Sequence, residues 1–339
     1  MTTTTTRSRT WDSVAPARRF QPLLVTLGIL ALIPALLASA LRLFPPTEDG
    51  PALLASFVPY GLFGYLLAAP LLLIAFFRAR GGRAALAVIT IGCLAGLTYQ
   101  ASSAVSMFVP DGRSATTPPF TLISLNMLGG MADPAGLARQ AQRADVVVLV
   151  EANPAGVARL ERYEWSERFR YVASATEDGS TGSVIYSRFP LSDSEPLPRS
   201  SFQQWAATAD VPEIGPVRIL AVHPCNPFCG NNDWAREHAQ LREVAAAQRA
   251  DRPLILAGDF NAIDDHGPLQ ALRRDGLRSA SDVAGAGWLP TYPANKPVPP
   301  LIPIDHVMIN SRLTATAAGT FRVGGTDHLG LQVTLAGTG

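Results

Sequence analysis

The 339-residue sequence predicts an α/β fold, a sandwich with sheets inside and helices outside, preceded by three helices that cross a membrane. Two observations lead to this prediction. Charged side chains make up 16% of the chain, against about 25% in an average globular protein, and only six of them fall in residues 22–109. From residue 118 onward, apolar segments with strand character alternate with segments of helical periodicity. We therefore expect one part of the chain in lipid and the other in water.

Three uncharged, apolar stretches are each long enough to cross a bilayer, which takes a helix of about 20 residues. They cover residues 23–41, 52–77 and 84–108. Buried core helices of a soluble protein are the alternative, but three stretches in succession with charges only between them favour spans. For the first stretch a cleaved signal peptide is a further alternative, because Arg18 and Arg19 precede it and Ala38-Ser39-Ala40 resembles a cleavage site.

Arginine is distributed unevenly around these stretches. It is enriched before the first stretch and between the second and third, at Arg7, Arg9, Arg18, Arg19, Arg78, Arg80 and Arg83. Because short cytoplasmic loops carry an excess of positive charge, those ends are expected in the cytoplasm. The domain after the third stretch is therefore expected to be extracytoplasmic, in a multi-pass protein of the cell membrane.

The composition divides the chain into four regions. Residues 1–21, which begin with a run of threonines, are predicted to be a disordered cytoplasmic N-terminus, and residues 22–109 a three-span membrane anchor. Residues 110–119 are polar and proline-rich, as in a short linker. Residues 120–339 are predicted to form one folded domain, and a chain of that length can bury a substantial core.

The domain is predicted to begin with a βαβ unit, made of a strand at 120–128, a helix at 133–144 and a strand at 145–151. Short apolar runs predict further strands at 182–188, 217–222, 253–258, 304–309 and 328–335. Helical periodicity predicts helices at 231–250 and 267–274. This mixture of strands and helices is typical of an α/β sandwich.

The three cysteines differ in their surroundings. Cys93 lies inside the third apolar stretch, where we expect it to pack without reacting. Cys225 and Cys229 share a short loop, and an oxidising compartment favours a disulfide between them. Reduced thiols, or a zinc site that also uses His223, remain alternatives, although no fourth zinc ligand is evident.

Polar side chains interrupt or follow the predicted strands, at the sheet ends where α/β folds build their sites. Singly, each has a structural explanation such as a cap or an Asx turn. Together they form a set of carboxylates, amides and imidazoles: Asn126, Glu151, His223, Asp259, Asn261, Asp305, Asp327 and His328.

This set has a chemical logic. Glu151 and Asn126 offer the oxygen ligands that Mg²⁺ prefers, and such an ion neutralises charge on a phosphoryl oxygen. Asp259 can orient a water molecule for attack, while His223 and Asn261 can donate hydrogen bonds to phosphate oxygens. The residues are therefore suited to metal-assisted hydrolysis of a phosphate ester.

Seven segments, in the order SLNML, VVLVEAN, GSVIYS, AVHP, LAGDFNA, IDHVMI and TDHLGL, carry a family resemblance over residues 120–336. The chain resembles the endonuclease/exonuclease/phosphatase superfamily, which includes DNase I-like nucleases, neutral sphingomyelinases and inositol-phosphate phosphatases. GDFN followed by IDH and a C-terminal DH is the strongest part of the match. The resemblance implies a four-layer α/β sandwich of the DNase I-like type and dependence on Mg²⁺, with Mn²⁺ as an alternative.

The resemblance also implies roles for the set. It makes Glu151, with Asn126 beside it, and Asp327 the metal-binding residues. The remaining five become catalytic residues: Asp259 for the attacking water, Asn261 and His223 for the phosphate, His328 as the catalytic histidine and Asp305 to orient it. His306 is expected to be structural, because strand alternation turns it to the other face.

The sequence departs from the family pattern at three places. Thr326 stands where serine is usual, which keeps a hydroxyl, and His223 stands where some abasic-site nucleases have tyrosine. The loop from Cys225 to Cys229 is unusual for the family. Residues 288–292 (WLPTY) are expected to form either an apolar rim beside the site or a structural loop.

Charge and anchoring bear on the substrate. From residue 118 onward there are 19 Lys and Arg against 23 Asp and Glu, a net charge of −4, so the surplus of basic side chains typical of DNA binding is absent. Anchored enzymes meet membrane-borne substrates at high local concentration. A lipid-linked phosphate is therefore the preferred substrate, with an extracytoplasmic nuclease and a non-enzymatic scaffold as alternatives. The arrangement also resembles that of bacterial membrane proteins associated with teicoplanin resistance, which are proposed to act on undecaprenyl-pyrophosphate-type carriers.

Overall fold

The computed structural model describes residues 17–176, 182–198, 200–248 and 252–338. Most of the predicted N-terminal region, 1–21, lies outside the described residues. The chain forms two compact units. One contains the residues up to Leu37 together with Tyr60–Gln100, and the other contains Ala38–Pro59 together with Ala101–Gly339.

The first unit is helical. Its helices are α1 (Ala17–Leu43), α3 (Gly61–Arg78) and α4 (Arg83–Ser106). The C-terminal turns of α1 and α4 belong to the second unit. Small and apolar side chains pack between them, including Ala35, Ala68, Leu72 and Cys93. Many larger apolar side chains on these helices are exposed, as in helices that face lipid. Three segments are long and apolar enough to span a membrane: Gln21–Leu43, Asp49–Arg78 and Arg83–Ser106.

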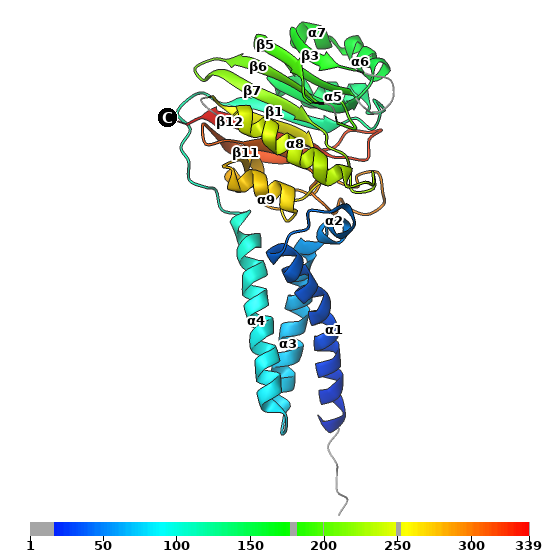
Figure 1. Ribbon diagram of the computed structural model, residues 1–339, viewed down its shortest axis with the longest axis vertical. Coiled ribbons are helices and arrows are strands. Elements are labelled where there is room, and N and C mark those ends of the chain that lie inside the picture. The colour runs from blue at the N-terminus through cyan, green and yellow to red at the C-terminus, as the bar shows by residue number, and fades with distance from the viewer. Residues whose placement is uncertain (1–16, 177–181, 199, 249–251, 339) are drawn as a thin grey trace, which may run out of the picture. The chain divides into compact units, whose positions relative to one another are not determined.

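The second apolar stretch, expected as one helix over 52–77, is divided. A short helix, α2 (Asp49–Ala55), is followed by a turn and a 3-10 turn, η1 (Val58–Tyr60), before α3 begins at Gly61. Pro59 lies at this break, where it has no backbone N–H to donate to a helical ladder. Residues Ala38–Pro59, which include α2, belong to the second unit, whereas α3 belongs to the first; Figure 1 labels both helices.

The second unit contains two six-stranded sheets. The first has the strand order β11 (Leu313–Phe321), β12 (Gly330–Gly337), β1 (Phe120–Asn126), β2 (Val146–Ala152), β4 (Gly182–Ser187), β3 (Tyr171–Ala175). The second has the order β5 (Leu191–Pro196), β6 (Trp205–Val211), β7 (Gly215–Val222), β8 (Leu254–Asp259), β10 (Asp305–Ile309), β9 (Arg278–Ser279).

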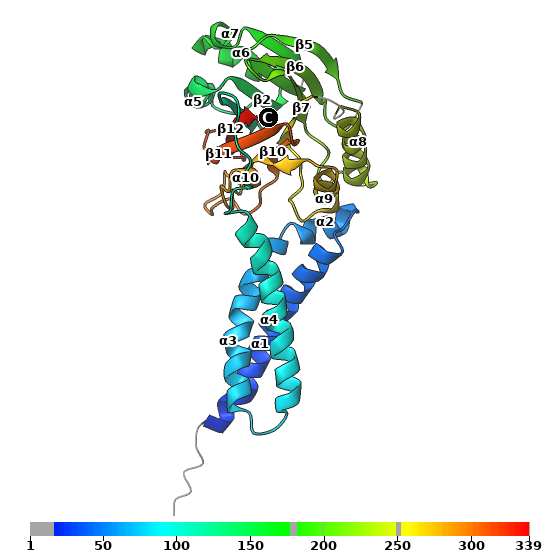
Figure 2. The ribbon, with the colours of Figure 1, turned by 90° about the vertical axis from the view of Figure 1, so that its left-hand side faces the viewer.

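The two sheets pack face to face, with helices on their outer faces (Figures 1 and 2). Leu122 and Val148 of the first sheet meet Ile219, Ile255 and Val307 of the second in a buried apolar core. The outer face of the first sheet packs against α5 (Pro134–Gln140), α6 (Pro154–Leu160) and α7 (Trp165–Arg168), and that of the second against α8 (Asp233–Gln248) and α9 (Gly267–Arg274). The predicted four-layer α/β sandwich is confirmed.

All predicted strands are present, although the one expected from residue 328 begins at Gly330. Helix 133–144 ends in a 3-10 turn, η2 (Ala141–Arg143), and helix 231–250 is observed as α8, with its last two residues outside the described part of the chain. Four longer strands were not predicted: β3, β5, β6 and β11. The side chains of β5 are mostly exposed and β11 is rich in alanine and threonine, so neither carries a strong apolar alternation.

Candidate functional site

Pairing between strands brings the polar set together. β1 and β2 are parallel, so Asn126 and Glu151 lie at neighbouring carboxyl ends. β7 and β8 are likewise parallel, which places His223, just after β7, beside the end of β8. β10 runs antiparallel to β8, and its first residue, Asp305, pairs with Asp259. The site therefore receives side chains from both sheets at one end of the sandwich.

Glu151 and Asp259 are held by a shared amide. Asn126 Nδ2 donates to Glu151 Oε1 at 2.9 Å and to Asp259 Oδ2 at 3.0 Å, and its Oδ1 accepts from the Leu128 backbone N–H at 2.9 Å. Glu151 Oε2 also accepts from the Gly129 N–H at 3.0 Å. Both polar atoms of Asn126 are thus engaged with the protein, and the amide positions the two carboxylates.

Two site residues adopt a backbone conformation that is rare for side chains other than glycine. Glu151 has φ 50°, at an irregularity in the pairing of β2 with β4, and Asn261 has φ 48°. Left-handed non-glycine residues cost on the order of 1–3 kcal/mol and concentrate at functional sites. Asn261 is fixed there because its N–H donates to Asp259 Oδ1 at 2.8 Å and its Nδ2 to the Pro224 carbonyl at 3.0 Å.

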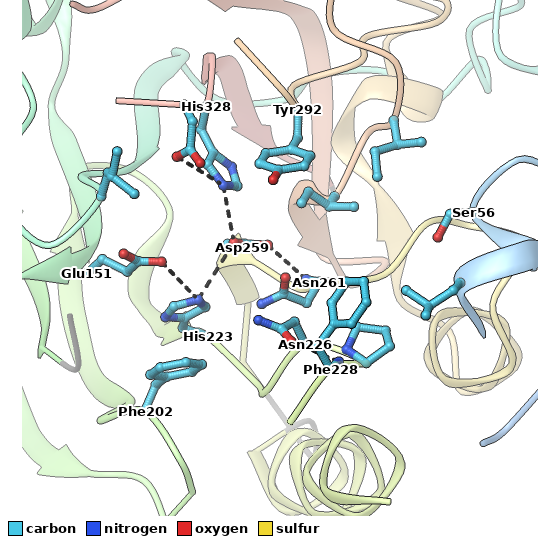
Figure 3. Close-up of a pocket in the computed structure, with 16 residues that line it drawn as sticks. Ser56, Glu151, Phe202, His223, Asn226, Phe228, Asp259, Asn261, Tyr292 and His328 are labelled. Atoms are coloured by element: carbon cyan, nitrogen blue, oxygen red, sulfur yellow. Dashed lines mark hydrogen bonds and ion pairs between the residues drawn. The ribbon is translucent and has the colours of Figure 1, made fainter. Parts of the chain in front are cut away.

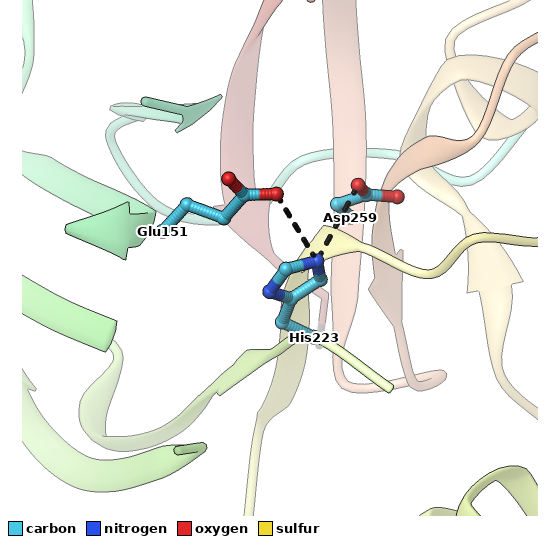
Figure 4. Close-up of side chains that lie close together, drawn as sticks. All are labelled: Glu151, His223 and Asp259. Atoms are coloured by element: carbon cyan, nitrogen blue, oxygen red, sulfur yellow. Dashed lines mark ion pairs between the residues drawn. The ribbon is translucent and has the colours of Figure 1, made fainter. Parts of the chain in front are cut away.

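His223 lies between the two carboxylates (Figure 4). Its Nε2 is 3.7 Å from Glu151 Oε1 and 3.6 Å from Asp259 Oδ2. Its ring stacks on Phe202, with centroids 4.2 Å apart and an interplanar angle of 10°. Burial lowers the pKa of His223, so its neutral form is favoured.

His328 is the positively charged centre of the cluster. Its Nδ1 lies 2.8 Å from Asp305 Oδ2, while its Nε2 is 3.7 Å from Asp259 Oδ2 and 3.9 Å from Asp327 Oδ1. Burial by itself would lower the pKa of His328, but the carboxylates of Asp305, Asp259 and Asp327 raise that pKa to about 10. At neutral pH the protonated ring donates from Nδ1 to Asp305 and directs its Nε2–H into the site.

The hydroxyl groups of Thr326 and Thr291 hydrogen-bond the backbone of Asn126, His328 and Asp305. Thr326 Oγ1 donates to the Asn126 carbonyl at 2.7 Å and accepts from the His328 N–H at 3.2 Å. Thr291 Oγ1 accepts from the Asp305 N–H at 3.3 Å. Thr326 stands where the family usually has serine, and its hydroxyl, which serine would also provide, links the backbones of Asn126 and His328.

Six of the eight predicted site residues line one cavity of about 220 Å³: Glu151, His223, Asp259, Asn261, Asp327 and His328 (Figure 3). Asn126 and Asp305 contact this group through the hydrogen bonds above. The structure therefore brings the whole set together, while the individual roles stay predictions. His306 points elsewhere, and its Nε2 lies 2.9 Å from the Ala262 carbonyl.

Several residues of the cavity were not predicted from the sequence. Phe202 and Phe228 carried no motif, and Leu53 and Ser56 were assigned to a membrane span. Of residues 288–292, Tyr292 lines this cavity, with its ring 5.0 Å from that of His328, while Trp288 lines a second cavity together with His306. An apolar rim therefore exists, but only part of the expected segment contributes to it.

The donor set fits a divalent cation. Glu151, His223 and Asp259 each present a ligand atom, and these atoms lie within 4.8 Å of one another. Burial raises the pKa of both Glu151 and Asp259, and a nearby cation would favour their charged forms. Asp327 Oδ1 is buried and accepts no hydrogen bond from any described residue. Carboxylate oxygens of this kind suit Mg²⁺ or Mn²⁺.

The Cys225–Cys229 disulfide, expected from the spacing, is present with a Cα–Cα distance of 6.2 Å. It closes the loop that carries three residues of the cavity wall, Asn226, Pro227 and Phe228. The Cys225 N–H donates to Glu237 Oε2 at 2.7 Å, which ties the loop to α8. The disulfide excludes the alternative in which both thiols bind zinc.

Known proteins share this fold. A solved endonuclease/exonuclease/phosphatase from Bacteroides vulgatus is 13% identical, covers 65% of this chain and 100% of its own, and gives a TM-score of 0.53. D. rerio TDP2, complexed with a single-strand DNA product, is 19% identical over 65% of this chain and 99% of its own, with a TM-score of 0.51. An endonuclease/exonuclease/phosphatase from Beutenbergia cavernae is 20% identical over 66% and 72%, with a TM-score of 0.50.

No curated protein matches the chain significantly. The profile of the Endonuclease/Exonuclease/phosphatase family, however, matches residues 123–328, which is more than half of the sequence. That range begins in β1 and ends at His328, so it includes every member of the polar set. The chain therefore belongs to the endonuclease/exonuclease/phosphatase family of metal-dependent phosphoric ester hydrolases.

Proposed function

We propose that this protein is a membrane-anchored, Mg²⁺-dependent phosphoesterase that hydrolyses a lipid-linked phosphate ester, phosphodiester or pyrophosphate on the outer side of the cytoplasmic membrane. The observation that carries the proposal is the single cavity in which carboxylates, an amide and two imidazoles from both sheets meet. The three apolar segments, each long enough to span a bilayer, support anchoring.

The geometry supports a role for each of these side chains. Asp259 is buried with a raised pKa, and each of its oxygens retains a lone pair, so it can accept a proton from an attacking water molecule. His223 and Asn261 lie beside it and can donate hydrogen bonds to phosphate oxygens. His328, kept protonated by Asp305, directs its Nε2–H toward the charge that develops on the phosphoryl group.

A divalent cation would be held by Glu151 together with Asp327, and when bound it would neutralise negative charge on the phosphoryl oxygens. Asn126 holds the Glu151 carboxylate in position for this task. Burial raises the pKa of Glu151, whereas the hydrogen bonds from Asn126 and Gly129 lower it. A bound cation would act in the same direction as these hydrogen bonds, because it would favour the ionised carboxylate.

Two observations support an extracytoplasmic site. The arginines cluster before the first apolar stretch and between the second and third, which orients those ends toward the cytoplasm. The disulfide in the wall of the cavity is of a kind that persists in oxidising compartments.

An extracytoplasmic nuclease is the second candidate, and the similarity to D. rerio TDP2 with its single-strand DNA product favours it. The charge of this chain argues against it. No lysine or arginine is among the described residues that line the cavity, and residues 118–339 carry a net charge of −4. Gripping a nucleic-acid backbone normally requires basic side chains that displace counterions.

The test uses the full chain in detergent with Mg²⁺, supplied in parallel with plasmid DNA, sphingomyelin and a prenyl pyrophosphate. We expect release of product from a lipid-linked substrate, and a loss on the order of 10²-fold or more in Asp259→Ala and His328→Ala. Glu243→Gln, which removes an exposed carboxylate from α8, is the control and should retain full turnover.

Three outcomes are informative. Salt-sensitive cleavage of plasmid DNA alone would favour the nuclease. Turnover that survives both substitutions would remove the assignment of the site. Absence of any turnover with Mg²⁺ and with Mn²⁺, from a chain that unfolds cooperatively, would favour a binding protein built on a hydrolase fold.

A further inference from the structure

The segment between the first two apolar helices, taken as Ala38–Pro59 and so including the last turns of α1, belongs to the second unit. Arg42 pairs with Asp265 through two hydrogen bonds, Nε to Oδ1 at 2.6 Å and Nη2 to Oδ2 at 2.9 Å, and both side chains are nearly inaccessible to solvent. His266 accepts at Nδ1 from the Ile263 N–H at 3.0 Å, so its Nε2 carries the proton and donates to the Ala52 carbonyl at 2.9 Å. Such buried, bidentate contacts fix a segment in place.

Packing adds to these polar contacts. Ala52 of α2 is fully buried in the same apolar cluster as Trp234 and Leu269. The backbone of the segment also approaches closely at Gly267, whose N–H donates to the Pro46 carbonyl at 3.3 Å, and a Cβ at that glycine would lie 3.0 Å from the same oxygen. The segment is therefore part of the fold of this unit.

This segment contributes to an apolar part of the lining of the cavity. Leu53 and Ser56 line it from this segment, and Phe228, Ile302 and Ile304 line it from two other loops. In Figure 3, Ser56 and the ribbon of α2 lie across the cavity from Glu151. The cavity lining thus combines the polar set with alkyl and aromatic side chains, and Phe228 and Ser56 lie on the side away from Glu151.

Phe228 extends this apolar part of the lining outward. Phe228 is 79% exposed on the disulfide-closed loop and also lines the cavity. A ligand with an apolar part would cover it.

We propose that Leu53, Phe228 and Ile302 form a subsite for the apolar chain of the substrate, next to the phosphate-binding end of the cavity. This inference rests on the proposed function and narrows it to phosphates that carry an alkyl or isoprenyl chain. The segment between the first two apolar helices then contributes, together with the loops of Phe228 and Ile302, to the selection of such substrates.

The covalent chain supports this choice of substrate. Ser56 precedes the first residue of α3, Gly61, by five positions. At most about 3.6 Å per residue, that tether keeps this apolar part of the lining within about 18 Å of the start of an apolar helix, whatever the arrangement of the two units. A chain embedded in the bilayer that surrounds α3 would therefore lie within reach of the subsite.

Binding of two non-hydrolysable ligands tests the proposal independently of turnover. Calorimetric titration of the full chain in detergent, with Mg²⁺, compares ethylphosphonate with hexylphosphonate, which share a head group and differ only in chain length. We expect hexylphosphonate to bind the unmodified protein at least about fivefold more tightly, because each further methylene group that the pocket buries adds to the affinity. In Leu53→Asn the ratio of the two affinities should fall toward one.

Leu54→Asn is the matched control, since Leu54 is the next residue of α2, is 60% exposed and does not line the cavity. It should keep the ratio of the unmodified protein. Phe228→Ala is a second test that does not threaten folding, because the ring is largely exposed, and it should lower the ratio as well. The thermal unfolding midpoint of each variant confirms that the chain is folded.

An equal ratio in Leu53→Asn, Phe228→Ala and the unmodified protein would overturn the subsite, as would a uniform loss of affinity for both ligands. Failure of the proposed function has a different signature: no turnover of any phosphate ester, with chain-length discrimination intact. Discrimination without turnover would leave a lipid-phosphate binding site in a protein that does not hydrolyse it.

Discussion

His328 shows how single side chains set the chemistry of this site. It is buried, which disfavours its charged form, yet three carboxylates lie around it and Asp305 is bonded directly to its Nδ1. The pKa of about 10 follows from this balance, so the ring stays protonated across the physiological range. Its partner Asp305 is held in turn by the Thr291 hydroxyl.

Asp305→Asn should lower kcat/KM on the order of 10²-fold and alter its pH dependence. The raised pKa of His328 means that its active, protonated form is lost only as the pH rises toward about 10. Without the Asp305 charge that pKa falls, so the alkaline decline in activity should move to lower pH. A pH profile between 6 and 9.5 checks this, and an unchanged alkaline limb in the variant would contradict the role given to Asp305.

Thr326 offers a second test at a single side chain, because its hydroxyl bonds both the Asn126 carbonyl and the His328 N–H. Thr326→Val removes the hydroxyl at nearly constant volume and leaves two buried groups without a partner, which should lower the free energy of unfolding by about 1–3 kcal/mol. Thr326→Ser keeps the hydroxyl and should lose about 0.8 kcal/mol for the missing methyl group. Urea unfolding of both variants measures the difference, and equal losses would contradict this reading.

Strands β7 and β8 approach each other closely where they deliver His223 and Asp259. Gly258 has φ 146° and pairs with Val222, and a Cβ at this glycine would lie 2.0 Å from the Val222 carbonyl oxygen. Steric contact therefore explains why glycine occupies the first position of the GDFN segment, since only a residue without a side chain allows the two strands to approach this closely.

Gly258→Ala is expected to lower the free energy of unfolding by more than about 3 kcal/mol, because the strands must separate at the base of the site. Gly319→Ala in the edge strand β11 is the matched control, since a Cβ there meets no atom within 4 Å. It should change stability by less than about 1 kcal/mol. Chemical unfolding compares the two, and similar stabilities would show that the strands tolerate a side chain at Gly258.

The orientation of the chain in a membrane is a separate prediction. Gly81 lies among the arginines that join α3 to α4, and Ser192 lies exposed in the edge strand β5. On intact cells, a membrane-impermeant maleimide should label Ser192→Cys but leave Gly81→Cys unlabelled until the membrane is opened. The buried Cys93 and the disulfide-bonded pair should give little background. Labelling of Gly81→Cys alone would place the catalytic cavity in the cytoplasm.

The features that depend on residues close together in the chain, namely the apolar segments, most strands and the polar set, were determined by the sequence itself. Length and apolarity identify three segments that could span a membrane. Apolar runs identify the strands that deliver Asn126, Glu151 and Asp259, because burial on both faces of a strand leaves a local pattern. The positions of polar side chains within or just after apolar runs singled out all eight members of the polar set. The exposed strand β5 was not predicted, because it is stabilised by its pairing with β6 and its own six residues show little strand pattern.

Only the tertiary structure decided which segments share the cavity. Leu53 and Ser56 read as part of a membrane span, and it is the Arg42–Asp265 pair, 223 positions apart in the chain, that fixes their segment against the catalytic unit. Trp288 likewise belongs to another cavity than Tyr292, only four residues further on. Apolar character predicts that a side chain will leave water, but the partner it packs against is set by contacts between distant segments, which local composition does not encode.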